Sequence, residues 1–163
     1  MKKLLLILLS VSCMYGVMAQ ENKFWSSHTD PGKLTTDKAV SRSSFPSSFK
    51  LFDVNINALQ QELFSVVGSR ATRQSTVITL PGAGGQLEEF EVFEASNFEP
   101  ALQAQFPEIR AYSGKGITDQ YATVKLSISP QGVQAMVFRT DKENEFLEPY
   151  SDNHRVYAVY AAQ

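Results

Sequence analysis

Cysteine is almost absent from this sequence, and histidine is scarce. The only cysteine is Cys13, and the only histidines are His28 and His154. Because Cys13 lies in an N-terminal apolar stretch, the rest of the chain has no disulfide and no thiolate ligand for zinc, and its stability must come from a hydrophobic core. A zinc protease needs His-Glu-x-x-His on one helix, and a serine hydrolase elbow needs Gly-x-Ser-x-Gly. Neither pattern occurs, so we expect no catalytic site in this chain alone.

Long apolar runs are also missing, except at the amino terminus. Lys2 and Lys3 precede the apolar run 4–9, and a weaker apolar stretch follows it. A membrane-spanning helix needs about 20 apolar residues, so this run is too short to span a bilayer and is typical of a secretory signal peptide. Val17 and Ala19 supply the small residues that signal peptidase requires, which predicts cleavage after Ala19 and a secreted, periplasmic or extracellular protein.

The alternative for this N-terminal segment is lipoprotein processing at Cys13. Ser10 stands where a lipobox prefers leucine, and cleavage at Cys13 would cut the apolar core short. We therefore favour a cleaved signal peptide over residues 1–19, with Cys13 carried inside it.

Positive charge is too sparse for a nucleic-acid partner. Removing 19 of the 163 residues leaves 144, a length that suits one domain. Two of the 15 lysines and arginines leave with the signal, so 13 face 17 acidic residues and the net charge becomes −4. No basic stripe is available to neutralise phosphates, and no membrane partner is expected once the signal is removed.

Residues 20–48 are predicted to form an extended polar arm. This range is rich in serine, threonine, lysine and aspartate, and its apolar residues follow neither a helical nor a strand period. Phe24 and Trp25 have two interpretations: they attach the arm to the domain surface, which we favour, or they grip a partner.

Residues 49–163 are predicted to form one α+β domain, an antiparallel β-sheet built from hairpins with two helices packed on one face. The expected strands are 50–54, 76–80, 89–93, 109–112, 123–129, 133–138 and 156–160. The first helix is expected to be capped by Asn57 and closed by Gly68, and the second to run from Pro100 to Pro107. Short turns join adjacent strands, which favours the antiparallel sheet.

Two patterns suggest ligand sites and are better explained as turns or strand faces. The glycine-rich segment 82–85 lacks the lysine and the following helix of a phosphate-binding loop, so it is predicted to be a hairpin turn. Glu89 and Glu91 share one strand face while Glu94 takes the other, and the polar turn 141–145 lacks the ligand alternation of a calcium loop. No catalytic, cofactor-binding or metal-binding residue is therefore assigned.

Five segments of the sequence together resemble a known family. They are FEVFEASNFEPAL at 90–102, FPEIRAYSGKG at 106–116, ATVKLS at 122–127, SPQG at 129–132 and EPY at 148–150. They resemble the N-terminal propeptide region of secreted reprolysin-like zinc metalloproteases of the Bacteroidetes and flavobacterial kind. The resemblance covers nearly the whole chain after the signal peptide. In that family a catalytic zinc domain follows, and no such domain follows Gln163, so the chain is expected to be either a truncated precursor or a free-standing propeptide homologue.

The resemblance implies a propeptide that assists folding of its protease and keeps it latent. The expected partner is the cognate metalloprotease catalytic domain, in cis or in trans, and zinc belongs to that domain. If this segment blocks the zinc, a carboxylate or imidazole must do so, and His28, Asp30 and Asp37 of the arm are possible ligands. The alternative is a ligand in the junction that follows Gln163 in a full precursor. A secreted module that binds peptide or glycan is the rival interpretation.

Overall fold

A computed structural model describes residues 22–30, 32, 34–36, 45–68 and 74–162. Its strands are β1 Trp25–Ser27, β2 Lys50–Val54, β3 Ser75–Pro81, β4 Leu87–Glu94, β5 Arg110–Gly116, β6 Thr123–Ser129, β7 Gly132–Phe138, β8 Glu145–Pro149 and β9 Val156–Ala161. Its helices are α2 Ile56–Phe64 and α3 Pro100–Gln105. The predicted signal peptide lies outside the described residues.

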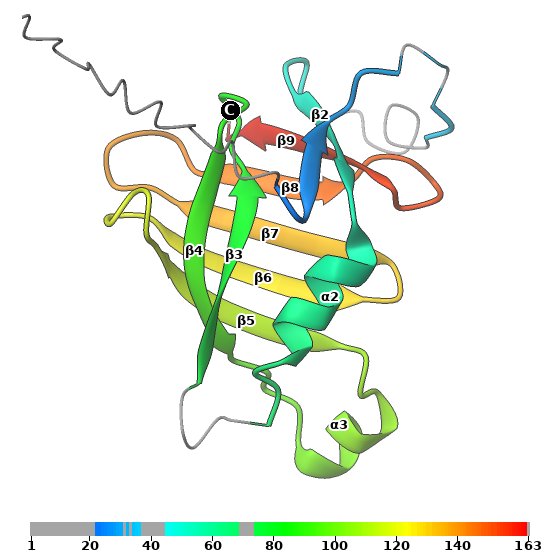
Figure 1. Cartoon of the computed structure of the whole chain (residues 1–163), viewed down its shortest axis with the longest axis vertical. Helices are drawn as coiled ribbons and strands as arrows, with labels where there is room; N and C mark the ends of the chain where they lie inside the picture. The colour runs from blue at the N-terminus through cyan, green and yellow to red at the C-terminus, as the bar shows by residue number, and fades with distance from the viewer. Residues whose placement is uncertain (1–21, 31, 33, 37–44, 69–73, 163) are drawn as a thin grey trace, which may run out of the picture.

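The strands form one antiparallel sheet of nine strands in the order β1-β2-β9-β8-β7-β6-β5-β4-β3. From β3 to β9 each strand pairs with the next one along the chain, and β2 then pairs with β9. The sheet is curled into a half-barrel, so that β3 and β4 cross over the strands that follow them (Figure 1). The edge strands β1 and β3 meet where the indole Nε1 of Trp25 donates to the carbonyl oxygen of Thr79 at 2.8 Å.

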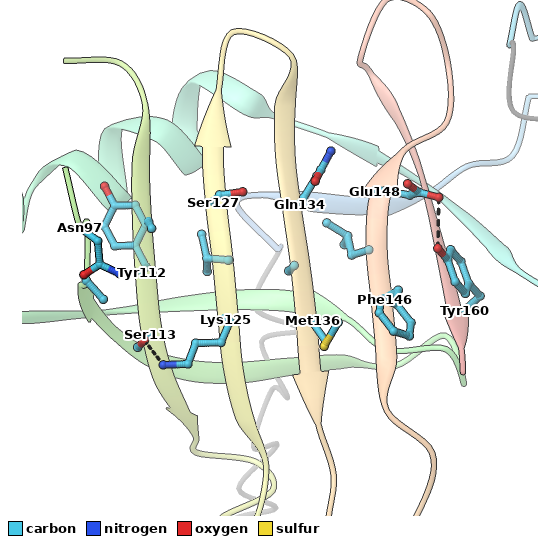
Figure 2. A pocket seen from close by; sticks show the side chains of 15 residues that line it. Asn97, Tyr112, Ser113, Lys125, Ser127, Gln134, Met136, Phe146, Glu148 and Tyr160 are labelled. Atoms are coloured by element: carbon cyan, nitrogen blue, oxygen red, sulfur yellow. Dashed lines mark hydrogen bonds between the residues drawn. The ribbon is translucent and has the colours of Figure 1, made fainter. Parts of the chain in front are cut away.

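The two faces of the sheet differ in polarity because side chains alternate along each strand. On β6, Val124, Leu126 and Ile128 are buried, while Lys125 and Ser127 are exposed on the outer face (Figure 2). The strand has the bounds predicted for it, and its alternation of apolar and polar residues separates the two faces. The β6–β7 hairpin also matches its predicted bounds closely, and Gly132 supplies the positive φ of 103° at the end of its turn.

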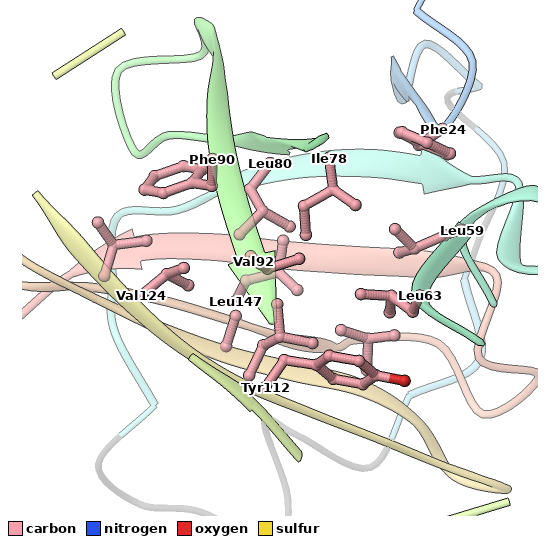
Figure 3. Packing of buried hydrophobic residues seen from close by; sticks show 14 of the residues in the cluster. Phe24, Leu59, Leu63, Ile78, Leu80, Phe90, Val92, Tyr112, Val124 and Leu147 are labelled. Carbon is pink, nitrogen blue, oxygen red and sulfur yellow. The ribbon is translucent and has the colours of Figure 1, made fainter. Parts of the chain in front are cut away.

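The concave inner face holds the hydrophobic core, and α2 fills it. Leu59 and Leu63 of α2 are fully buried and face the apolar side chains of the sheet (Figure 3). The helix begins two residues earlier than predicted, because Asn55 is the cap and its Oδ1 accepts from the Ala58 amide at 3.1 Å. The predicted cap, Asn57, lies inside the first turn.

The prediction of two helices packed on one face of the sheet is wrong. The structure is mostly antiparallel β, with α2 alone inside the curled sheet. None of the residues of α3 is buried, and Leu102 and Phe106, expected to face the core, are 41% and 42% exposed. The helix α3 is short, because its six residues make fewer than two turns. A helix of this length is too short to cover the face of the sheet.

Two strands were not predicted. β1 lies within the arm, and β8 follows the predicted polar turn. Phe24 and Trp25 are both buried, and Trp25 packs edge-on against Tyr157 with ring centroids 5.3 Å apart, which agrees with the attachment interpretation. In the described part of the chain, no helix combines the length and apolar content needed to cross a bilayer.

Candidate functional site

The outer face of strands β5 to β9 carries an open groove of about 810 Å³. One row of side chains crosses all five strands at right angles, because each member pairs directly with the next: Ser113, Lys125, Met136, Phe146 and Tyr160. Figure 2 shows these residues following one another across the sheet. The row places a cation, a thioether and two aromatic rings in sequence.

A second row lies beside the first and explains why the surface is hollow. Ala111 pairs with Ser127, which pairs with Gln134, and Glu148 continues this row on β8 (Figure 2). Ala111 and Ser127 are small, so they leave space next to the long side chains of the first row. Asn97, from the segment after β4, lines the same groove.

The charged side chains of the groove are held by hydroxyl groups. Lys125 Nζ donates to Ser113 Oγ at 2.5 Å, and the Tyr160 hydroxyl donates to Glu148 Oε1 at 3.1 Å. Lys125 and Glu148 lie two strands apart, or about 10 Å. The Phe146 and Tyr160 rings stack with centroids 5.6 Å apart and an interplanar angle of 21°. The groove therefore presents opposite charges with an apolar surface between them.

Phe45, near the end of the arm, packs against Tyr160 at the β9 side of the groove. The ring of Phe45 lies 5.7 Å from that of Tyr160, and it also contacts Phe49 at 5.2 Å and Tyr150 at 5.9 Å. The end of the segment predicted as an arm thus packs against the strands that carry the groove. These contacts fix the position of Tyr160.

The pair Ser113 and Lys125 does not amount to a catalytic dyad. A lysine serves as the base for a serine nucleophile only where burial removes the charge from the amine. Lys125 is exposed, and its Nζ donates a hydrogen bond to the Ser113 hydroxyl. The chemistry available here is recognition: a positive charge held in place beside an apolar row.

The proposed zinc-blocking residues do not come together. His28 Nδ1 lies 3.0 Å and 3.1 Å from the two carboxylate oxygens of Asp53, and Asp30 accepts from the Gly32 amide at 2.8 Å. Asp37 lies outside the described residues. Over the described ranges, no three His, Cys, Asp or Glu side chains are grouped to hold a metal ion. None of the described candidates lines the groove.

Buried ion pairs close one end of the core around Arg139. The side chain of Arg139 is 1% exposed, and its guanidinium lies 2.7 to 2.8 Å from carboxylate oxygens of Glu88, Asp119 and Glu145. Burial opposes the charge on Arg139, yet the three carboxylates raise its pKa above the ordinary value. The hydrogen bond from Arg139 lowers the pKa of Asp119. The three carboxylates balance the buried charge of Arg139, so we interpret this cluster as structural.

A second ion pair closes the other end of the core. Glu94 Oε1 lies 2.9 Å from Arg110 Nη1, and Glu94 Oε2 accepts from the Gly68 amide at 2.8 Å. Burial alone would raise the pKa of Glu94, but the Gly68 amide, Arg110 and Ser96 outweigh it and lower this pKa. The sequence of β4 already indicated that Glu94 differs from its neighbours, because the alternation of the strand assigned Glu94 to the face opposite Glu89 and Glu91.

Comparison with known proteins finds no match: no protein-family model, no curated protein and no solved structure is similar to this chain. The propeptide resemblance therefore stays a prediction. The groove itself was missed because Phe146 and Glu148 lie on β8, a strand that was not predicted. Part of the groove could have been predicted from the β6–β7 hairpin, because its register places Lys125 beside Met136.

Proposed function

We propose that this chain is the propeptide domain of a secreted zinc metalloprotease precursor, which assists folding of the catalytic domain and keeps it latent. One observation supports the proposal: four of the five segments that carry the resemblance are separate in sequence but meet at the groove. Nine of the 15 residues lining it lie in these segments, namely Ala95, Asn97, Ala111, Tyr112, Ser113, Lys125, Leu126, Ser127 and Glu148. A surface that contacts the protease would concentrate such residues.

The groove suits a template role. It lies on five strands that are each paired on both sides, so its side chains are displayed on a rigid surface. A propeptide acts in cis, where the effective concentration of its partner is high, so each contact can be weak. Such a domain guides folding without binding its mature product irreversibly.

A secreted peptide- or glycan-binding module is the second candidate function. It is favoured by the aromatic rings of Phe146 and Tyr160 beside the polar groups of Gln134 and Glu148, a combination that binding grooves use. The two functions differ in their partner, because only the propeptide requires a protease catalytic domain.

Refolding of a catalytic domain separates these functions. The catalytic domain of a precursor from the resembled family is refolded with and without residues 20–163, and protease activity is measured after the added chain is removed. We expect higher recovery with the chain present, and weak inhibition of the mature enzyme while it remains. Equal recovery in both samples, with full activity at saturating chain, would refute the propeptide function.

A matched pair of variants links the effect to the groove. Ser127→Arg places a long side chain on the groove floor, whereas Thr123→Arg changes an exposed residue of the same strand and face outside the groove. We expect Ser127→Arg to reduce the recovered activity and Thr123→Arg to leave it unchanged. Thermal melting of both variants checks that they remain folded.

A further inference from the structure

We infer that the groove binds an extended polypeptide segment laid across strands β5 to β9, with an acidic residue at Lys125 followed at the second and fourth positions by apolar residues. The inference rests on the proposed function only in taking the protease as the source of this segment. The chemistry of the ligand comes from the groove alone.

The geometry requires recognition by side chains. An extended peptide can join a sheet only at a free strand edge, where backbone groups are unpaired. Strands β5 to β9 all have neighbours on both sides, and the groove crosses them at right angles. A bound segment therefore lies on top of the sheet and contacts the two rows of side chains.

Charge sets where the acidic residue of the segment lies. Lys125 is the one cation among the residues that line the groove, and Glu148 is the one carboxylate. Ser113 holds the ammonium of Lys125 in place, which lowers the entropy lost when a carboxylate binds it. An acidic side chain thus belongs at β6, and a negative group near β8 is repelled by Glu148.

Strand spacing sets the pattern that follows the acidic residue. Neighbouring strands lie about 4.8 Å apart, so Met136, Phe146 and Tyr160 stand roughly 5, 10 and 14 Å from Lys125. Alternate residues of an extended chain repeat about every 6.8 Å on one side. The second residue after the acid then sits between Met136 and Phe146, and the fourth sits between Phe146 and Tyr160. Both positions are apolar, which requires leucine-like or aromatic side chains there.

A neutral oligosaccharide fits these features less well. Sugars bind flat on exposed ring faces, but the Phe146 and Tyr160 rings stack on each other, and Phe45 packs against Tyr160 as well. A neutral sugar also offers no anion to Lys125. The groove therefore matches an acidic, apolar peptide better than a glycan.

Fluorescence polarisation with the chain from residue 20 onward tests this inference. The probe is a labelled peptide, glycine-glutamate-serine-leucine-serine-leucine-glycine, and its partner probe carries lysine in place of glutamate. We expect the glutamate peptide to bind more tightly than the lysine peptide. Lys125→Glu should weaken glutamate-peptide binding about five- to tenfold and reverse the preference. Lys115→Glu is the control, because Lys115 is an exposed lysine of the same sheet outside the groove lining.

Three results would overturn the inference: no binding of either peptide, equal loss of binding in Lys115→Glu and Lys125→Glu, or displacement of the glutamate peptide by the lysine peptide at equal concentration. Binding of cellohexaose in place of both peptides would assign the groove to a glycan. The protease takes no part in this assay. Charge-dependent peptide binding together with a failed refolding assay would overturn the proposed function alone.

Discussion

Glu88 and Glu94 lie on the same inward face of β4, and each pairs with an arginine at an opposite end of the core. Glu88 Oε2 is 2.8 Å from Arg139 Nη1, and Glu94 Oε1 is 2.9 Å from Arg110 Nη1. Between them on β4, Phe90 and Val92 are buried in the hydrophobic core. A single strand thus carries the apolar centre and both charged ends of the interior.

Arg139→Ala should strongly destabilise the fold. The substitution leaves Glu88 and Glu145 buried without their cation, and breaking a buried ion pair in this way costs about 3 to 5 kcal/mol. Urea unfolding at pH 7 measures the loss. The control is Arg155→Ala, because Arg155 is exposed, and its change should stay within about 0.5 kcal/mol. Similar values for the two variants would show that the cluster adds no stability.

Stability should depend on pH through Glu94. The folded state lowers the pKa of this carboxyl below its ordinary value of 4.5, so its contribution to stability is present above the unfolded pKa and is lost as pH falls through the folded pKa. The free energy of unfolding should therefore fall between about pH 5 and pH 3. Glu94→Gln should lower stability at pH 7 and flatten this dependence.

The control for the pH experiment is Glu89→Gln, which lies exposed on the opposite face of β4. Urea unfolding at several pH values compares both variants with the unchanged chain. Glu89→Gln should keep the wild-type profile. If Glu94→Gln keeps it as well, the acid sensitivity arises from another group.

The register of β6 predicts that substitutions at two neighbouring residues lower the free energy of unfolding by very different amounts. Leu126 is buried against the core, so Leu126→Ala should cost about 2 to 5 kcal/mol, whereas Ser127→Ala on the outer face should cost under about 0.5 kcal/mol. Thermal or urea unfolding of the two variants gives the comparison. Small and equal losses would contradict the assignment of Leu126 to the inner face.

The junction of the two sheet edges should depend on the indole of Trp25. Trp25→Phe keeps the buried ring but removes the donor to the Thr79 carbonyl, which should cost about 1 to 3 kcal/mol because a buried acceptor loses its partner. Hydrogen exchange should then increase along β1 and along β3 near Thr79. Unchanged protection of both strands would show that the indole hydrogen bond does not hold the edges together.

The hairpins could be predicted from the sequence, but the curl of the sheet could not. Short turns and alternating apolar residues identify β3–β4 and β6–β7, because these signals are local. The contact between Trp25 and Thr79 joins residues 54 positions apart, and no local pattern encodes it. The second helix forms where its local signals predicted it, but its predicted packing on the sheet is wrong, because local signals do not encode tertiary contacts.

Local sequence patterns also could not predict β8 or the groove. Glu145 and Glu148 make β8 look polar, yet both are buried, and their partners are Arg139, which follows β7, and Tyr160 on β9. The groove depends on one further condition, the unshifted register of five strands. A one-residue slip in any pairing would turn members of the row inward.

The place of β9 in the sheet has a consequence for the order in which the chain can fold. Within the described residues, β2 pairs only with β1 and β9, so the first two strands have no place in the sheet until the last strand arrives. A ribosome releases β2, which ends at Val54, long before β9, which begins at Val156. During synthesis the early strands can therefore pair only with each other, and they join the rest of the sheet in a late step of slow, non-local pairing. A chain cut short before β9 would lose the N-terminal strands as well as the C-terminal one.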